Sequence, residues 1–410
     1  MKKFFALLLS LAMVLALVAC GQKDPTPDTP DTPDDPQTKV EYKVAMITDY
    51  GDITDQSFNQ TTYEACKTFA EDNSIEFSYF KPAGDNTADR VAMIEKAVND
   101  GFNVIVMPGY AFGGAIVEAA PEFPDVKFIA LDVAAGDLLE TAVAKAGEAY
   151  DYTPENWDLN KYVDMSNVYC AVYQEELCGY MAGYAAVKLG YKNLGFLGGM
   201  SVPAVVRYGY GFVQGVDAAA ADLGLTDVKL NYIYGGQFFG DADITAVMDT
   251  WYQGGTEVVF ACGGGIYTSA VDAAKKVGAK VIGVDVDQAG VIAKYAGVDG
   301  MTVTSAMKGL YPATYDTLTD VIVNGNWDKY VGKIETLGLV SGTDPEANYV
   351  QIPMGDGTQW SDSFTQDDYK AMVKDMFDGK ITVSNNTSSD VSAADFATVI
   401  TVDDQGSIKG

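Results

Sequence analysis

The sequence predicts an α/β fold made of two doubly wound parallel-sheet lobes with a ligand cleft between them. Short runs rich in Val, Ile and Phe alternate with amphipathic helical stretches, and the runs are apolar at nearly every position. That pattern is typical of strands buried on both faces of a parallel sheet. One strand arrangement also occurs twice along the chain, and a length of 410 residues fits two domains.

Residues 1–19 have the features of a secretory signal peptide. Two lysines precede an apolar run that is short for a membrane span and ends in small residues. Residues 17–20, Leu-Val-Ala-Cys, resemble a bacterial lipobox, which implies cleavage before Cys20 and lipidation of its thiol. The alternative is an ordinary signal peptide with a chance cysteine.

Residues 20–40 form a linker rich in Pro, Thr and Asp after the lipidated cysteine. Such a segment lacks the apolar side chains needed for a core, and its prolines favour extended conformations. We therefore expect a stalk that holds the folded part outside the cytoplasm, with the lipid as its sole attachment to the membrane.

The folded part begins near Tyr42. In its helices, apolar residues recur at i, i+3 and i+7 from Val91 and at i, i+3, i+4 and i+7 from Ile244. The strand candidates include residues 42–48, 102–108, 126–132, 193–199, 256–263 and 279–286.

An internal parallel relates the two halves of the folded part. The run NVIVMPG ends at residue 109, 23 residues before Asp132, and EVVFACG ends at Gly263, 22 residues before Asp285. Open α/β sheets bind ligands outside the carboxyl ends of their strands. Two facing lobes would therefore bring Asp49, Asp132 and Asp285, each at a strand end, around one cleft.

Each of these residues also has a structural interpretation. An aspartate between a strand and a helix is often a helix N-cap, and the glycines at 263–265 fit either a tight turn or amides beside a ligand. Phe58 and Phe238 either pack in a core or line the cleft. Three further aromatic residues are interpreted as packing residues: Tyr208, Tyr210 and Phe212.

Composition excludes several function classes. Lys and Arg total 27 against 57 Asp and Glu, a net charge of −30 that would repel a nucleic acid. The chain contains no histidine, so Ser-His-Asp and Cys-His catalysis and imidazole-bound zinc are excluded. The aspartates at positions 49, 52 and 55 come closest to a calcium loop but do not complete one, so we expect neither a metal nor a cofactor.

The cysteines at 66, 170, 178 and 262 show no CxxC spacing. Outside the cytoplasm a disulfide between Cys170 and Cys178 is an alternative, but we favour free, buried thiols.

Several motifs resemble the BMP family of basic membrane lipoproteins, which includes PnrA-like purine nucleoside receptors of ABC transporters. The most specific are DxSFNQ within residues 49–60 and GVDxDQ within residues 282–288. The resemblance continues through NLGFLGGMSVP (193–203), YGGQFFGDAD (234–243), ACGGG (261–265) and TSAMKG (304–309).

The resemblance implies a fold of the type I periplasmic-binding-protein kind. We place the N-terminal lobe at residues 41–172 plus 286–316 and the C-terminal lobe at residues 173–285 plus 317–410. Residues 134–167 and about 340–410 depart from the family. The first segment would edge the cleft or a partner surface, and the second would decorate the C-terminal lobe.

The resemblance also implies roles for the site residues. Phe58 and Phe238 would sandwich a purine, Asp49 and Asp132 would contact the base edge, and Asp285 and Lys308 would hold the ribose. Asn59 and Gly263 complete the expected ligand-binding set, and no residue is expected to be catalytic.

The implied function is that of a lipid-anchored, monomeric substrate-binding protein, not an enzyme. It would capture purine nucleosides and deliver them to an ABC permease and its ATPase. The alternatives are a binding protein for another hydroxylated molecule, such as a sugar or a different nucleoside, and a surface sensor with the same fold. A lyase using paired carboxylates is disfavoured.

The lipobox generates a test of membrane attachment. Replacing Cys20 with serine removes the thiol that would carry the lipid, so the Cys20→Ser protein should leave the membrane fraction, as followed by immunoblotting of fractionated cells. Retention of this variant in the membrane fraction would show that another anchor is present.

Overall fold

The computed structural model describes residues 41–409. The predicted signal peptide, the predicted lipidation site Cys20 and the predicted linker up to residue 40 lie outside the described residues. Within residues 41–409, no helix is both long enough and apolar enough to span a membrane.

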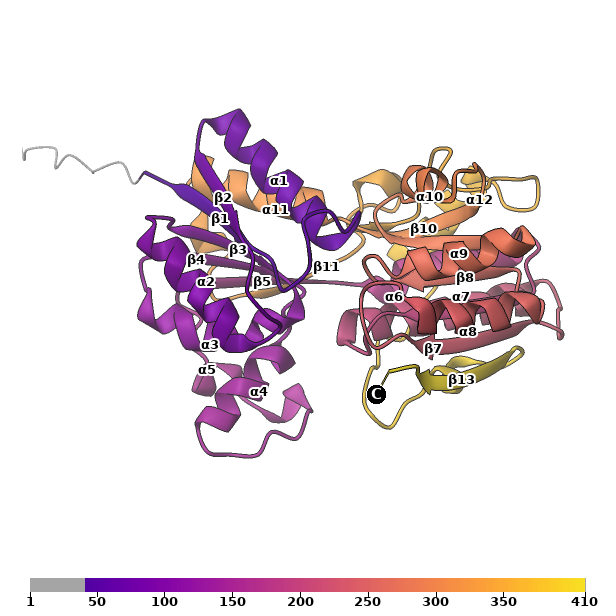
Figure 1. The fold of residues 1–410 in the computed structure, drawn as a ribbon, viewed down its shortest axis with the longest axis horizontal. Coiled ribbons are helices and arrows are strands. Elements are labelled where there is room, and N and C mark those ends of the chain that lie inside the picture. The colour runs from indigo at the N-terminus through magenta and orange to yellow at the C-terminus, as the bar shows by residue number, and fades with distance from the viewer. Residues whose placement is uncertain (1–40, 410) are drawn as a thin grey trace, which may run out of the picture. The chain divides into compact units, whose positions relative to one another are not determined.

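A first sheet has the strand order β11-β5-β4-β3-β1-β2, with every neighbouring pair parallel (Figure 1). Its strands are β1 (Lys43–Ile47), β2 (Glu76–Phe80), β3 (Val104–Pro108), β4 (Lys127–Leu131), β5 (Val168–Tyr173) and β11 (Ile334–Leu337). The helices of this lobe are α1 (Phe58–Asn73), α2 (Thr87–Asn99), α3 (Gly113–Ala119), α4 (Ala135–Lys145), α5 (Leu159–Tyr162) and α11 (Leu310–Leu318).

A second sheet has the order β12-β10-β9-β8-β6-β7-β13, in which β12 runs antiparallel to β10. Its strands are β6 (Asn193–Gly198), β7 (Lys229–Tyr234), β8 (Val258–Cys262), β9 (Lys280–Asp285), β10 (Thr302–Lys308), β12 (Val350–Gln351) and β13 (Thr401–Ser407). The helices of this lobe are α6 (Glu175–Lys188), α7 (Pro203–Asp222), α8 (Ala242–Gln253), α9 (Tyr267–Val277), α10 (Ala289–Ala296) and α12 (Gln366–Phe377).

The two sheets share one connectivity. The second strand of each lobe lies outside the first, and the third, fourth and fifth strands follow on the other side. The prediction of two doubly wound lobes is confirmed. The central strands β3 and β8 are buried at every position, which explains why their apolar runs are easily recognised in the sequence.

The lobe boundaries differ from the expected ones in two places. Residues 286–308 were expected in the N-terminal lobe, but they contain α10 and β10, and β10 is hydrogen-bonded to β9 in the second sheet. Residues 317–337 were expected in the C-terminal lobe, but β11 pairs with β5 in the first sheet. Apolar runs identify strands, whereas the sheet edge that a late strand joins depends on long-range pairing.

Three chain segments cross between the two sheets, and backbone hydrogen bonds join them. The Gln174 amide donates to the Leu337 carbonyl (3.0 Å), and the Gly309 amide donates to the Tyr349 carbonyl (2.7 Å). The Tyr349 amide in turn donates to Gly338 (3.0 Å). The three segments that connect the lobes are therefore hydrogen-bonded to one another.

One departure from the family pattern is built onto the first lobe, and the other is built onto the second. Residues 134–167 form α4, α5 and a loop in which Trp157 packs edge-on against Tyr150 and Tyr162. The tail supplies β12, α12 and β13, and both of its strands belong to the second sheet, as expected. The cysteines at 66, 170, 178 and 262 are free and buried, as expected.

Helices α6 and α7 pack together at unusually short range because glycines lie at their crossing. A Cβ atom on Gly211 would lie 2.1 Å from the Glu176 carbonyl oxygen, and one on Gly215 would lie 2.1 Å from that of Tyr180. Gly179 and Gly183 make equally close approaches from α6 to the backbone of α7. Any side chain larger than hydrogen would force the helices apart.

Gly211→Ala should therefore lower the free energy of unfolding by about 1–3 kcal/mol, as expected for an overpacked core. Gly290→Ala in α10 is the matched control, because the space around that glycine is open. It should leave stability unchanged or raise it by up to about 1 kcal/mol through better helix propensity. Equal urea-unfolding free energies for the two variants would contradict the proposed steric constraint.

Candidate ligand-binding site

The carboxyl ends of both sheets border one cavity of ≈ 420 Å³. In each lobe the cavity lies where the strand order reverses, between β1 and β3 in the first sheet and between β6 and β8 in the second. Open α/β sheets bind ligands at this position. All eight residues predicted to bind ligand line this cavity: Asp49, Phe58, Asn59, Asp132, Phe238, Gly263, Asp285 and Lys308. No residue of 134–167 or of the described tail after 340 lines it.

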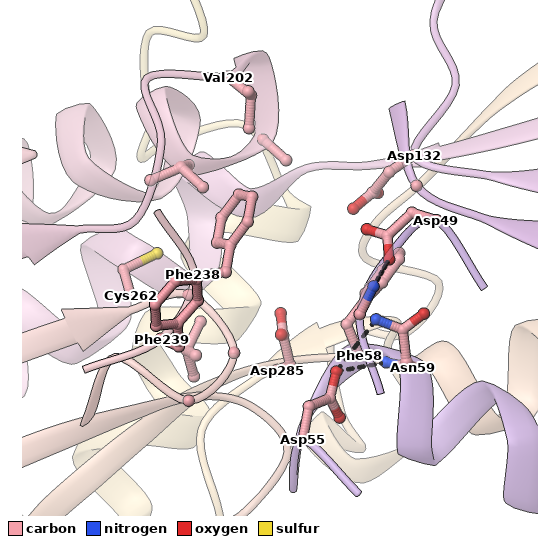
Figure 2. A pocket seen from close by; sticks show the side chains of 18 of the residues that line it. Asp49, Asp55, Phe58, Asn59, Asp132, Val202, Phe238, Phe239, Cys262 and Asp285 are labelled. Carbon is pink, nitrogen blue, oxygen red and sulfur yellow. Dashed lines mark hydrogen bonds between the residues drawn. The ribbon is translucent and has the colours of Figure 1, made fainter. Parts of the chain in front are cut away.

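The cavity has an apolar side and a polar side. Figure 2 shows Phe238, Phe239, Val202 and Cys262 of the second lobe on one side. Carboxylate and amide groups of the first lobe, from Asp49, Asn59 and Asp132, lie opposite, with Asp285 between the two sides. A ligand that fills this space must therefore combine an apolar face with hydrogen-bonding edges.

Two aspartates occupy equivalent strand ends in strained backbone conformations. Asp132 follows β4 with φ of 58°, and Asp285 ends β9 with φ of 65°. Non-glycine residues rarely adopt positive φ, and such strain is concentrated at functional sites. Their equivalence in the two lobes supports the internal parallel seen in the sequence.

The DxSFNQ motif forms the start of α1, and Asp55 caps it. One Asp55 carboxylate oxygen accepts from the amides of Ser57 (2.9 Å) and Gln60 (3.1 Å), and the other accepts from the Asn59 amide (2.9 Å). This cap fixes the turn from which Phe58 and Asn59 line the cavity. The Ser57 hydroxyl donates across to Asp285 of the second lobe.

Two acceptor atoms at the cavity have no partner among the described residues. The Asn59 side-chain amide donates to Asp55 (3.2 Å), which leaves its Oδ1 buried and unpaired. The Oδ1 atom of Asp132 is also buried and unpaired. Because an unpaired buried polar atom costs free energy, both atoms are suited to accept hydrogen bonds from a ligand.

Asp49 is held at the end of β1 by backbone donors. Its Oδ1 accepts from the amides of Tyr50 (2.6 Å) and Gly51 (2.7 Å), while Arg90 donates to its backbone carbonyl (3.1 Å). Burial raises the pKa of the Asp49 carboxyl, and these amide hydrogen bonds oppose that rise.

Lys308 joins carboxylates from both lobes. Its ammonium nitrogen pairs with Asp132, lies 3.3 Å from Glu175 Oε1 and 3.8 Å from Asp285 Oδ1. Burial alone would lower the pKa of Lys308, but the three carboxylates outweigh it and hold the pKa above its ordinary value. The ammonium also lies 4.8 Å from the centre of the Phe58 ring, in cation–π range.

Glu175 extends this charge network away from the cavity. It is fully buried at the start of α6, and its Oε2 accepts from Arg207 Nε (2.7 Å). The network of three carboxylates and two cations thus remains net negative, which disfavours a charged anion as ligand.

Phe238 lies against glycines that leave room for its ring. A Cβ atom on Gly199 would lie 2.4 Å from the ring, and one on Gly263 would lie 2.8 Å from it. Gly263 also has a positive φ of 145°. The glycines at the ends of β6 and β8 therefore provide the space that the Phe238 ring occupies.

Sequence reasoning missed part of the site. Tyr208, interpreted as a packing residue, lines the cavity and donates to Asp285 Oδ1 (3.3 Å). Tyr50, Tyr110 and Phe239 also line it. No periodicity distinguishes a cavity-lining tyrosine on α7 from its core-facing neighbours.

Comparison with known proteins identifies a protein family and relatives that this chain resembles in sequence. A sequence profile for a family described as "ABC transporter substrate-binding protein PnrA-like" matches residues 42–343. The ABC transporter nucleoside-binding protein BmpA of Lactococcus lactis subsp. cremoris is 25% identical, covering 92% of this chain and 96% of the relative. Basic membrane protein B of Borreliella burgdorferi is 26% identical over 76% of this chain and 83% of its own.

Solved structures share the fold. A solute-binding protein of an ABC transporter system from Aeropyrum pernix superimposes with a TM-score of 0.63 at 18% identity, over 85% of this chain and 95% of the other. A solute-binding protein from Conexibacter woesei gives 0.58 at 20% identity, over 84% and 99%.

Buried carboxyl groups predict an unusual pH dependence of stability. Burial raises the pKa of Asp132 to about 6 and those of Asp137 and Glu176 to about 7. The native protein therefore binds protons more tightly than the unfolded chain between about pH 7 and pH 4.5. The free energy of unfolding should rise as the pH falls from 8 to 5.

Glu176→Gln isolates the contribution of one carboxyl group to this pH dependence, because Glu176 is buried and its Oε2 has no partner among the described residues. At pH 8 the variant should be more stable than the wild type by roughly 1–3 kcal/mol, and the difference should shrink by pH 5. Glu118→Gln, at an exposed position, is the control and should change neither value. A pH-independent difference in urea unfolding would contradict this prediction.

Proposed function

Because the chain belongs to the family of PnrA-like ABC transporter substrate-binding proteins, we propose that it captures purine nucleosides in the cavity between its lobes. Its role in an ABC transporter follows from the family. The ligand class, the residues that hold it and the lipid anchor are our proposals.

One observation carries the choice of ligand: an aromatic ring from each lobe lines the same cavity. Phe58 comes from α1 of the first lobe, and Phe238 comes from the loop before α8 of the second. Both rings are only partly buried, so neither is enclosed within its own lobe. Stacking of a base on such rings contributes about 1–3 kcal/mol per base, whereas a simple sugar makes less use of two aromatic faces.

The polar groups of the cavity complement a nucleoside. Unpaired oxygens of Asn59 and Asp132 accept hydrogen bonds, as do carboxylates in general, and a purine base offers N–H donors at its edge. We assign Asp49, Asn59 and Asp132 to the base edge, and Asp285 with Lys308 to the ribose hydroxyls. The Lactococcus relative, whose name describes nucleoside binding, supports a nucleoside as the class of ligand.

The charge of the site favours nucleosides over nucleotides. Lys308 is already surrounded by Asp132, Glu175 and Asp285. A phosphate group would enter a net negative, largely buried environment and would have to displace one of these carboxylates.

Binding would draw the two lobes together about the three crossing segments. Asp132 belongs to the first lobe and Asp285 to the second, so a ligand that contacts both favours the closed arrangement. We propose that the permease and its ATPase accept this closed form. We also propose that the protein acts as a monomer, anchored outside the cytoplasm through Cys20, in line with the naming of relatives such as a Pyrococcus abyssi protein as lipoproteins.

The test is calorimetric titration of the chain without its predicted signal peptide and with Cys20 replaced by serine. Ligands would be inosine, guanosine, adenosine, cytidine, guanosine monophosphate and ribose. We expect binding of at least one purine nucleoside, with the monophosphate and ribose weaker. Binding of ribose as tight as that of the nucleosides, or of no nucleoside at all, would overturn the proposal.

In the same assay, Phe238→Ala should weaken purine nucleoside binding by about 1–3 kcal/mol, the contribution of one stacking contact. Phe377→Ala, which removes a half-exposed ring on α12 that does not line the cavity, is the control and should bind like the wild type. Unchanged affinity of the Phe238 variant would assign that ring a purely structural role.

A further inference from the structure

We propose that Lys409, just after β13, is a positioning residue for the loop that carries Phe238. The loop comprises residues 235–241 and connects β7 to α8. In this proposal, β13 and Lys409 act as a strap that holds the loop, and thereby the aromatic wall of the cavity, in its binding conformation. The consequence for ligand affinity rests on the proposed function, whereas the effect on the loop does not.

The inner side of the loop is held against the cavity by backbone contacts. The amides of Gly235 and Gly236 donate to Gly198 (2.7 Å) and Gly199 (2.9 Å), and the Phe238 carbonyl accepts from Gly265 (2.8 Å). Three of the seven loop residues are glycines. Because glycine has the largest conformational freedom, such a loop needs further contacts to remain in one conformation.

The outer side of the loop is closed by Lys409. Its ammonium nitrogen pairs with Asp241 and lies 3.0 Å from the Gln237 side-chain oxygen. The Gln237 amide nitrogen donates to the Phe239 carbonyl (2.9 Å) and to Asp241 (3.0 Å). Lys409 thus completes a ring of contacts with Gln237 and Asp241, which lie on either side of the phenylalanine pair along the chain.

Asp241 has two separate tasks in this arrangement. Its Oδ1 accepts from the Ile244 amide (3.0 Å) and caps α8, while its Oδ2 contacts Lys409 and Gln237. The lysine is therefore the better residue to change, since its removal leaves the helix cap intact.

Strand β13 brings Lys409 to this position. It pairs in parallel with β7 at the edge of the second sheet, and the Ile408 amide donates to the Tyr234 carbonyl (2.8 Å) directly before the loop. Gln405 also accepts from the Trp251 indole of α8 (3.2 Å). The backbone of Lys409 lies so close to Gly236 that a Cβ there would be 2.6 Å from the Lys409 carbonyl oxygen.

The strap lies outside residues 42–343, the stretch that matches the family profile. The loop it contacts lies inside that part and supplies Phe238 and Phe239 to the cavity lining. A segment after the stretch that matches the family profile therefore makes direct contact with a wall of the proposed binding site.

The first test measures the loop without any ligand. Lys409→Met removes the ammonium but keeps most of the aliphatic stem, Lys409→Arg restores the charge, and Lys380→Met removes an exposed ion pair elsewhere in the tail. By hydrogen–deuterium exchange, the amides of residues 235–240 should exchange several-fold faster in Lys409→Met, with rescue by arginine and no change in Lys380→Met. Equal exchange in Lys409→Met and the wild type would overturn the proposal.

The second test measures affinity for inosine and guanosine in the same variants. Lys409→Met should bind roughly 3- to 10-fold more weakly, because the ligand must then order the loop. Faster exchange with unchanged affinity would overturn the positioning role. If the wild type binds no nucleoside, the proposed function fails, while the exchange experiment still decides whether Lys409 holds the loop.

Discussion

The buried ammonium of Lys308 is the interaction on which the arrangement of the lobes and the site depends. A buried lysine is costly unless it is paired, and here its partners come from both lobes: Asp132 from the first, Glu175 and Asp285 from the second. Lys308 ends β10 immediately before one crossing segment, and Glu175 begins α6 immediately after another. The charge network, the crossings and the cavity therefore share one location, so a ligand that contacts Asp132 and Asp285 acts on the joint between the lobes.

Local backbone and side-chain conformations preorganise the rest of the site, and some of them cost free energy of folding. Two aspartates at equivalent strand ends adopt positive φ angles, and acceptor atoms of Asn59 and Asp132 are buried without a partner in the described chain. Asp55 offsets part of this cost by capping α1 with three hydrogen bonds to backbone amides. The surrounding fold holds these groups in place, and a ligand with suitable hydrogen-bond donors would offset the free-energy cost of the unpaired acceptors.

Two parts of the chain support the aromatic wall of the cavity, one within residues 42–343 and one after them. The glycine-rich ends of β6 and β8 leave room for Phe238 within the residues that match the family profile, whereas Lys409 contacts the same loop from a segment after those residues. The insertion at 134–167 packs its own aromatic residues together and does not line the cavity. Of the two departures from the family pattern, the tail is thus the one that reaches the site.

The sequence by itself determined the fold class, because strands buried on both faces leave continuous apolar runs that need no tertiary information to be recognised. It also indicated all eight predicted cavity residues: Asp49, Asp132 and Asp285 follow from strand ends of parallel sheets meeting at one edge, and the family resemblance of the motifs supplied the others. Tertiary structure alone decided that β10 belongs to the second sheet and β11 to the first, because strand partners are chosen by long-range pairing. It also decided the roles of Tyr208, Glu175 and Lys409, whose partners lie 77, 133 and 168 residues away along the chain.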